Sequence, residues 1–169
     1  NVHEKGRMVD FVTDEEGPFS PERAGKLPSK MLVDLCYSGK YTYEEMAKNI
    51  RGKGGIVSYL NTVNAKEVEE RINNGDGYAK LIYDALALQV AKAIGELSTV
   101  VNGNVDAIII TGGIAYSKYM SESISNKFIA PVEIMPGENE LEALAFGVLR
   151  VMNGEEEATV YRETDLIKA

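Results

Sequence analysis

Cysteine and histidine are nearly absent from this sequence of 169 residues, which contains one of each. A single cysteine cannot form a disulfide within the chain. Cys36 is preceded by Leu32, Val33 and Leu35, so we expect it in the core rather than as a nucleophile. His3 lies in a predicted polar turn with no second type of metal ligand beside it, and we therefore expect it to be solvated rather than catalytic.

Long apolar runs are also missing from the sequence. No stretch approaches the roughly 20 apolar residues of a membrane helix, and no signal peptide is visible, so we expect a cytoplasmic protein without a membrane partner. A formal net charge of −8 argues against a general nucleic-acid binder, which would be basic. The segment from Arg23 to Lys53 departs from this balance, with seven basic and three acidic residues. It could serve a small anion, and a set of solvated lysines is the alternative.

The length and the 44% hydrophobic content are those of one ordinary globular domain with a real core. Helix-start signals recur along the chain, such as Thr42 with Glu45 and Asn64 with Glu67. Together with apolar spacing they predict a hairpin at 1–12, strands at 108–110 and 132–135, and helices at 30–37, 43–52, 65–74, 76–101, 118–126 and 139–152.

The stretch from Asp106 to Ser117 organises the rest of the chain. Three consecutive isoleucines predict a strand that is buried on both faces. Gly112 and Gly113 then allow a tight turn and a close approach to a ligand, and Ser117 can cap the following helix. A strand that ends at a helix start favours an anion such as phosphate. A tight turn without any ligand is equally compatible with these residues.

Arg23 is the second feature that could carry chemistry. Ser20 and Pro21 predict a helix start that would hold this arginine rigidly. A rigid arginine suits a bidentate grip on phosphate or carboxylate oxygens, and pairing with a nearby carboxylate such as Glu22 is the alternative. The glycine pair that follows Lys53 does not have P-loop spacing, which favours a hinge or turn there.

Acidic residues gather at the start of the predicted last helix. Asn139 and Glu142 fit a capping box there. Glu138 and Glu140 have no such structural role. They could complement the helix dipole, or they could hold a Mg²⁺ ion, which usually needs one or two carboxylates together with phosphate oxygens.

Taken together, these features resemble the butyrate kinases, in the acetate and butyrate kinase group of the sugar kinase, Hsp70 and actin superfamily. The resemblance runs nearly from end to end, in the same order, and it covers the second half of such a kinase. The segments that carry it are Glu16–Gly25, Leu35–Gly39, Lys53–Gly55, Asp106–Ser117, and Pro136–Glu140 with the following Ala143–Ala145.

The resemblance implies roles for individual residues. Arg23 matches the arginine that steadies the transferred phosphoryl group in the related acetate kinases, and Glu140 matches the carboxylate that organises Mg²⁺. We therefore expect both to be catalytic, with Glu140 as the metal-binding residue. The positions that match the contacts to ATP or ADP are Asn64, Lys66, Gly112, Gly113 and Ile114.

The reaction implied by the resemblance transfers the γ-phosphoryl group of ATP to butyrate or a branched short-chain carboxylate, giving an acyl phosphate and ADP. It needs alignment and charge neutralisation more than covalent help. The implied protein is a homo-oligomer, dimeric or larger. The phosphate loops and the acyl-acceptor pocket would lie upstream, so we expect this chain alone to bind nucleotide weakly and not to turn over. A catalytically inactive module that binds nucleotide for regulation or assembly is the alternative.

The fold implied by the resemblance is an α/β domain of the ribonuclease H-like kind, with a mixed sheet and helices on its faces. We expect residues 1–154 to form this nucleotide-binding domain and residues 155–169 to form a solvated tail. The nucleotide should lie at the carboxyl ends of the strands, beside Gly112 and Gly113.

Overall fold

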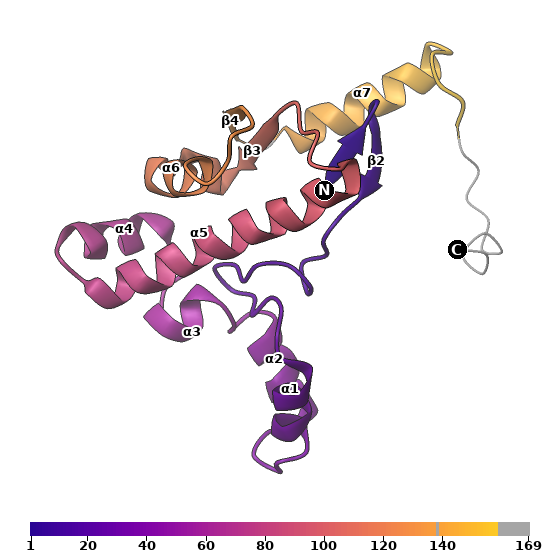
Figure 1. The fold of residues 1–169 in the computed structure, drawn as a ribbon. Helices are drawn as coiled ribbons and strands as arrows, with labels where there is room; N and C mark the ends of the chain where they lie inside the picture. The colour runs from indigo at the N-terminus through magenta and orange to yellow at the C-terminus, as the bar shows by residue number, and fades with distance from the viewer. Residues whose placement is uncertain (138, 159–169) are drawn as a thin grey trace. The chain divides into compact units, whose positions relative to one another are not determined.

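The structure, a computed structural model, describes residues 1–137 and 139–158. The chain divides into two compact units, Asn1–Pro136 and Gly137–Ala169. In chain order the elements are β1 (Val2–Glu4), β2 (Arg7–Asp10), α1 (Ser29–Cys36), α2 (Tyr43–Ile50), α3 (Ile56–Leu60), α4 (Ala65–Asn73), α5 (Gly77–Ser98), η1 (Thr99–Val101), β3 (Ile108–Gly112), η2 (Gly113–Tyr116), α6 (Lys118–Ser125), β4 (Val132–Pro136) and α7 (Glu140–Met152) (Figure 1).

Several helices of the first unit begin where the sequence predicts. Thr42 and Glu45 form the expected capping box of α2, because each side chain accepts a hydrogen bond from the backbone N–H of the other. Asp76 caps α5 by accepting from the N–H groups of Tyr78 and Ala79. Such caps depend only on residues within one helical turn, which is why the sequence reveals them.

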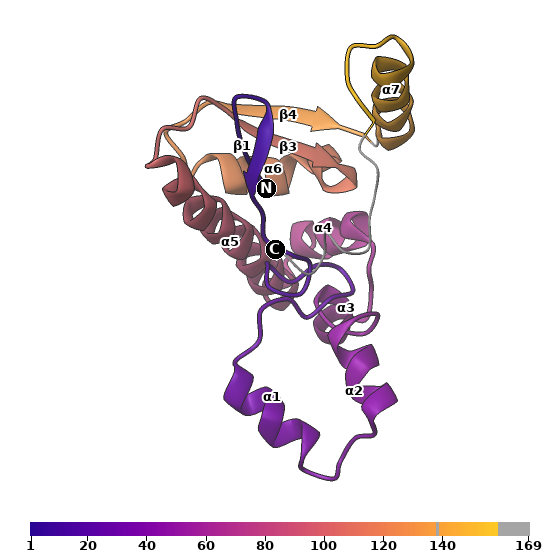
Figure 2. The same cartoon turned by 90° about the vertical axis from the view of Figure 1, so that its right-hand side faces the viewer.

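The strands form two separate two-stranded sheets in the described part of the chain. β1 and β2 form the predicted antiparallel hairpin. β3 and β4 are parallel, with Ile110 opposite Ile134, and the chain passes from one to the other through α6. Figure 2 shows these two strands side by side and running in the same direction. The expected single mixed sheet is therefore not formed by the described residues.

β3 is buried on one face only, and the prediction of a strand buried on both faces is wrong. Ile108 and Ile110 are buried, whereas the side chain of Ile109 between them is 62% exposed. Side chains alternate across a strand, and only the face of Ile110 packs against the helices of the unit. The three isoleucines thus follow the alternation of a strand with one covered face.

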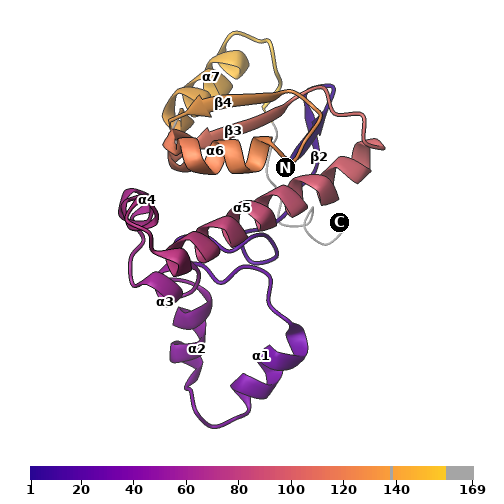
Figure 3. The same cartoon turned by 60° about the vertical axis from the view of Figure 1, so that its left-hand side comes forward.

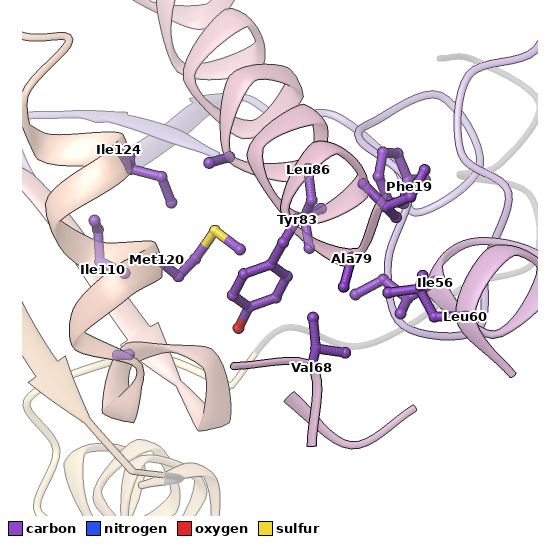
Figure 4. Close-up of a cluster of buried hydrophobic side chains, with 13 residues drawn as sticks. Phe19, Ile56, Leu60, Val68, Ala79, Tyr83, Leu86, Ile110, Met120 and Ile124 are labelled. Carbon is purple, nitrogen blue, oxygen red and sulfur yellow. The ribbon is translucent and has the colours of Figure 1, made fainter. Parts of the chain in front are cut away.

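α5 is the central helix of the first unit, with β3, β4 and α6 on one side of it and α3 on the other (Figures 1 and 3). The close-up of the core shows Phe19, Ile56 and Leu60 on one side of α5, and Ile110 and Met120 on the other (Figure 4). A helix that packs on both sides buries more than one stripe of residues.

This position of α5 changes which of its residues are buried. The apolar spacing of the sequence from 76 to 101 predicts a single apolar face that includes Tyr78 and omits Tyr83. In the structure Tyr78 is 51% exposed and Tyr83 is fully buried. The buried residues of the helix are Ala79, Ile82, Tyr83, Leu86, Ala87 and Ala91. The helical turns continue to Val101 as predicted, with the last residues in the 3₁₀ helix η1.

The helix expected after Ser20 is absent. The backbone of this segment pairs instead with the end of α2, because Ala24 donates to the carbonyl of Ile50 and Gly52 donates to the carbonyl of Glu22. The Ser20 hydroxyl accepts from the N–H of Arg23 at 3.0 Å, so it closes a turn rather than starting a helix.

Cys36 was expected in the core and is instead exposed at the end of α1. None of the residues of α1 is buried, because this short helix contributes nothing to the hydrophobic core of the unit. Two of the neighbours that suggested burial are exposed with it, Val33 at 52% and Leu35 at 43%, whereas Leu32 is half-buried.

The second unit contains one described helix, α7, which ends before Gly154 as predicted. The capping box expected from Asn139 and Glu142 is not formed, since the Asn139 side chain makes no capping hydrogen bond. The backbone of Asn139 has φ −100° and ψ 23°, whereas a capping residue is usually extended. Glu138 lies outside the described residues.

Candidate functional site

The turn after β3 is the clearest candidate for a ligand contact. Gly112 has a φ of +78°, which an L-residue rarely adopts, and η2 follows it directly. A Cβ atom placed on Gly112 or Gly113 would meet nothing within 4 Å. The turn therefore faces open space, and its backbone is free for close approach by a small molecule.

A largely buried network of hydroxyl and carboxylate groups is hydrogen-bonded to the end of this turn. Ser117 caps α6 by accepting from the N–H of Met120 at 3.0 Å, and its hydroxyl donates to a carboxylate oxygen of Glu69 on α4. The phenol of Tyr83 on α5 donates to the same oxygen at 3.1 Å. Burial, aided by the nearby carboxylate of Glu69, raises the pKa of Tyr83 to about 12, so the phenol stays protonated.

Asn64 and Lys66 lie at the start of α4. The Asn64 side chain accepts from the backbone N–H of Lys66 at 3.0 Å and so caps this helix. The expected capping box is incomplete, because the Glu67 carboxylate accepts from the hydroxyl of Thr62 instead. Glu69 is three positions beyond Lys66 and therefore lies on the same side of the helix. The network of Glu69 thus connects the helix that carries Asn64 and Lys66 to the glycine turn.

Arg23 is held by its backbone and paired through its side chain. Its N–H donates to the Ser20 hydroxyl, and its carbonyl accepts from the N–H of Ser20 at 3.0 Å. Its guanidinium lies 3.1 Å from a carboxylate oxygen of Asp14, and the guanidinium of Arg51 lies 3.3 Å from the same oxygen. The partner is therefore Asp14, not Glu22. The backbone of Arg23 is therefore held by two hydrogen bonds, while its side chain remains 37% exposed.

Gly54 and Gly55 seat the loop of Arg23, a role that the sequence alone did not reveal. A Cβ on Gly55 would lie 1.9 Å from the carbonyl oxygen of Ser20, and a Cβ on Gly54 would lie 2.5 Å from the nitrogen of Ala24. The N–H of Ile56 donates to that same carbonyl of Ser20. The predicted hinge or turn is thus a close contact between two segments, which the adjacent glycines signal only indirectly.

The structure brings some of the predicted residues together and separates others. Asn64 and Lys66 are linked to the glycine turn through Glu69. Phe19, four residues before Arg23 in the sequence, lies on the other side of α5 from Ile110, two residues before Gly112 (Figure 4). Glu140 is the first residue of α7 and belongs to the second unit.

A second polar cluster, between α5 and α6, was not predicted. The ammonium of Lys80 and the hydroxyl of Tyr119 both donate to the carboxylate of Asp84, at 2.5 and 2.6 Å. Burial favours a higher pKa for Asp84, but these two hydrogen bonds outweigh it and leave the pKa below its ordinary value. Asp84 also lines an open groove of about 420 Å³ together with Leu88, Ser123, Asn126 and Lys127.

The described residues do not include a ready-made metal centre or membrane helix. Among residues 1–137 and 139–158, no three histidine, cysteine, aspartate or glutamate side chains are grouped so that they could hold a metal ion. A magnesium ion that is bound mainly by phosphate oxygens needs only one or two carboxylates, as Glu140 could supply. In the same residues, no helix combines the length and apolar character that crossing a membrane requires.

Comparison of the sequence with known proteins identifies close relatives. Residues 8–153 match the model of the acetokinase family. The chain is 55% identical over 165 residues to butyrate kinase 1 of Clostridium acetobutylicum, covering 95% of this chain and 46% of that protein. It is 46% identical over 165 residues to a probable butyrate kinase of Bacteroides thetaiotaomicron, covering 95% of this chain and 47% of that protein. The chain therefore spans about half the length of these curated relatives.

Comparison of the fold identifies solved structures with a similar architecture. The acetate kinase of Entamoeba histolytica superposes with a TM-score of 0.69 at 16% identity, over 80% of this chain and 43% of that one. The acetate kinase of Porphyromonas gingivalis superposes with a TM-score of 0.60 at 24% identity, over 66% of this chain and 28% of that one. At these identities the likeness concerns the α/β fold alone.

Proposed function

The chain belongs to the acetokinase family, and from this premise we propose that it is the nucleotide-binding part of a short-chain carboxylate kinase. The complete protein would transfer the γ-phosphoryl group of ATP to butyrate or a branched short-chain carboxylate. The products are an acyl phosphate and ADP. The observation that carries this proposal is the match to butyrate kinases over 95% of the chain.

The nucleotide would bind at the turn after β3. Gly112, Gly113 and Ile114 would approach the ribose and α-phosphate, and the open space beside both glycines fits this role. Asn64 and Lys66 would face the adenine. The same proposal places the chain in a ribonuclease H-like domain of the sugar kinase, Hsp70 and actin superfamily, as a cytoplasmic homo-oligomer.

Arg23 would stabilise the phosphoryl group during transfer. A guanidinium can donate two parallel hydrogen bonds to phosphate oxygens, so it can stabilise the negative charge on the phosphoryl oxygens in the transition state. The seating of its loop on Gly54 and Gly55 supports this role, because the base of the side chain is fixed before substrate arrives. Substrate would have to replace Asp14 as the partner of the guanidinium.

Magnesium would be organised by Glu140. Glu140 places a carboxylate at the start of α7. If phosphate oxygens supply the other ligands of the ion, Mg²⁺ needs no further carboxylate from the described residues. When bound, the ion supplies charge neutralisation between the phosphates. The contribution of the chain is then to bind the nucleotide at the glycine turn and to hold the backbone of Arg23 in place.

The experiment compares Arg23→Ala with Arg51→Ala in the full-length protein. Both arginines contact the same oxygen of Asp14, so the second variant controls for loss of that ion pair. We expect Arg23→Ala to lower kcat by about 100- to 1,000-fold, as removal of other transition-state charge donors does. The KM for Mg-ATP should change little, and Arg51→Ala should stay near the wild-type kcat.

Two outcomes would contradict the proposed role. Equal losses in the two variants would mean that the ion pair, not the charge of Arg23 on substrate, matters. A full-length protein that binds nucleotide but forms no acyl phosphate in a hydroxamate assay would favour the alternative, a nucleotide-binding module for regulation or assembly. We also propose that this chain alone does not turn over, and the same assay tests that.

A further inference from the structure

Glu69 joins three elements of the first unit through one carboxylate oxygen. It accepts hydrogen bonds from the hydroxyl of Ser117, at the start of α6, and from the phenol of Tyr83 on α5. Tyr83 is fully buried and Ser117 is 8% exposed, while Glu69 is half-buried on α4. Hydrogen bonds to a charged acceptor are stronger than neutral ones, and burial keeps water from replacing them.

Ser117 passes this constraint on to the glycine turn. Its N–H donates to the carbonyl of Ile114 at 3.0 Å, so the residue that Glu69 holds also closes η2. The same hydroxyl caps α6 at the N–H of Met120. The position of the turn therefore depends on a side chain from α4, and Ile114 is itself one of the predicted nucleotide contacts.

We propose that Glu69 is a positioning residue for the nucleotide, because its carboxylate fixes the distance between the start of α4 and the glycine turn. The ligand class is a nucleoside di- or triphosphate that touches both segments. This inference rests on the proposed function. Glu69 itself does not touch the ligand; it acts through Ser117, and it holds two predicted contact surfaces at one spacing before the ligand arrives.

The test uses the full-length protein and four variants. Glu69→Ala removes the acceptor, whereas Glu69→Gln keeps an oxygen that can accept from both hydroxyls. Tyr83→Phe removes one donor with almost no change of volume. Glu70→Ala is the matched control, since Glu70 is the exposed neighbour on the same helix. The dissociation constant of Mg-ADP is measured by calorimetry, and the KM values for nucleotide and carboxylate are measured by steady-state kinetics.

We expect Glu69→Ala to weaken Mg-ADP binding and to raise the nucleotide KM by about tenfold, because small misplacements of contact groups are costly. Glu69→Gln should restore binding to within about threefold, because the acceptor oxygen is retained. Glu70→Ala should match the wild type, and the carboxylate KM should not move in any variant. If Glu69→Ala fails to fold, Tyr83→Phe carries the test, with an expected weakening of about threefold.

Three results would overturn the inference. In the first, the wild type binds Mg-ADP, and the Glu69→Ala and Tyr83→Phe variants bind it as tightly as the Glu70→Ala control. The second is a Glu69→Ala variant in which both KM values rise equally, which would indicate general damage. In the third, the wild-type protein does not bind Mg-ADP, which would refute the proposed function as well. The wild-type titration alone separates this result from the first two.

Discussion

Replacing Gly55 by alanine should dislodge the loop that carries Arg23. Gly55 has φ 69° and ψ −145°, a conformation that is nearly restricted to glycine and costs other residues about 2 kcal/mol. The added Cβ would also lie 1.9 Å from the Ser20 carbonyl oxygen, which accepts from the N–H of Ile56. Loss of that hydrogen bond adds about 1–2 kcal/mol. We therefore expect the free energy of unfolding to fall by about 3–4 kcal/mol.

Gly39→Ala is the control for this prediction. Gly39 has nearly the same φ, +70°, but a Cβ there would meet nothing within 4 Å. Only the left-handed backbone is then penalised, by about 1 kcal/mol. Urea unfolding of both full-length variants, followed by circular dichroism, measures the difference. If Gly55→Ala lost no more stability than Gly39→Ala, the close packing of the Arg23 loop on this glycine would be refuted.

Two further predictions concern helix caps. Hydrogen bonds from the N–H of Ala79 and from the side chain of Arg71 lower the pKa of Asp76 below its ordinary value of 3.8. The Asp76 carboxylate therefore contributes its full stabilisation above pH 3.8, and this stabilisation is lost as the pH falls through the lowered pKa. Asp76→Asn should thus have a lower free energy of unfolding than the wild type at neutral pH, and urea titrations should show this difference shrinking below about pH 4. A difference that stayed the same in acid would contradict the prediction. Asn64→Ala should lower the free energy of unfolding by about 1 kcal/mol, because the α4 cap at Lys66 is lost. Asn64→Asp should restore it, and equal stability of all three proteins would argue against the cap.

Local features of this protein could be predicted from the sequence, and features that depend on distant partners could not. The caps at Thr42 and Asn64 involve residues within one turn of the chain, and the structure contains both. The segment at Ser20 has the local pattern of a helix start, yet its backbone groups pair with the end of α2. The sequence contains no local record of that pairing, so the predicted helix was wrong.

The candidate site divides in the same way. The order of the motifs was enough to place the chain among the butyrate kinase relatives, and the family match agrees. The tertiary structure decides two other features: the packing of the Arg23 loop against Gly54 and Gly55, and the hydrogen bond from Ser117 to Glu69. Each depends on side chains or backbone groups that meet only after folding.

By itself, the sequence determined which family the chain belongs to and where some of the helices start, such as α2 at Thr42, because these follow from residue types in a fixed order. Tertiary structure decided which faces are buried: Ile109 is exposed although both of its neighbours are apolar, and Tyr83 is buried although it lies outside the predicted apolar face. Burial depends on what packs against a face, and that partner is supplied by elements far away in the chain.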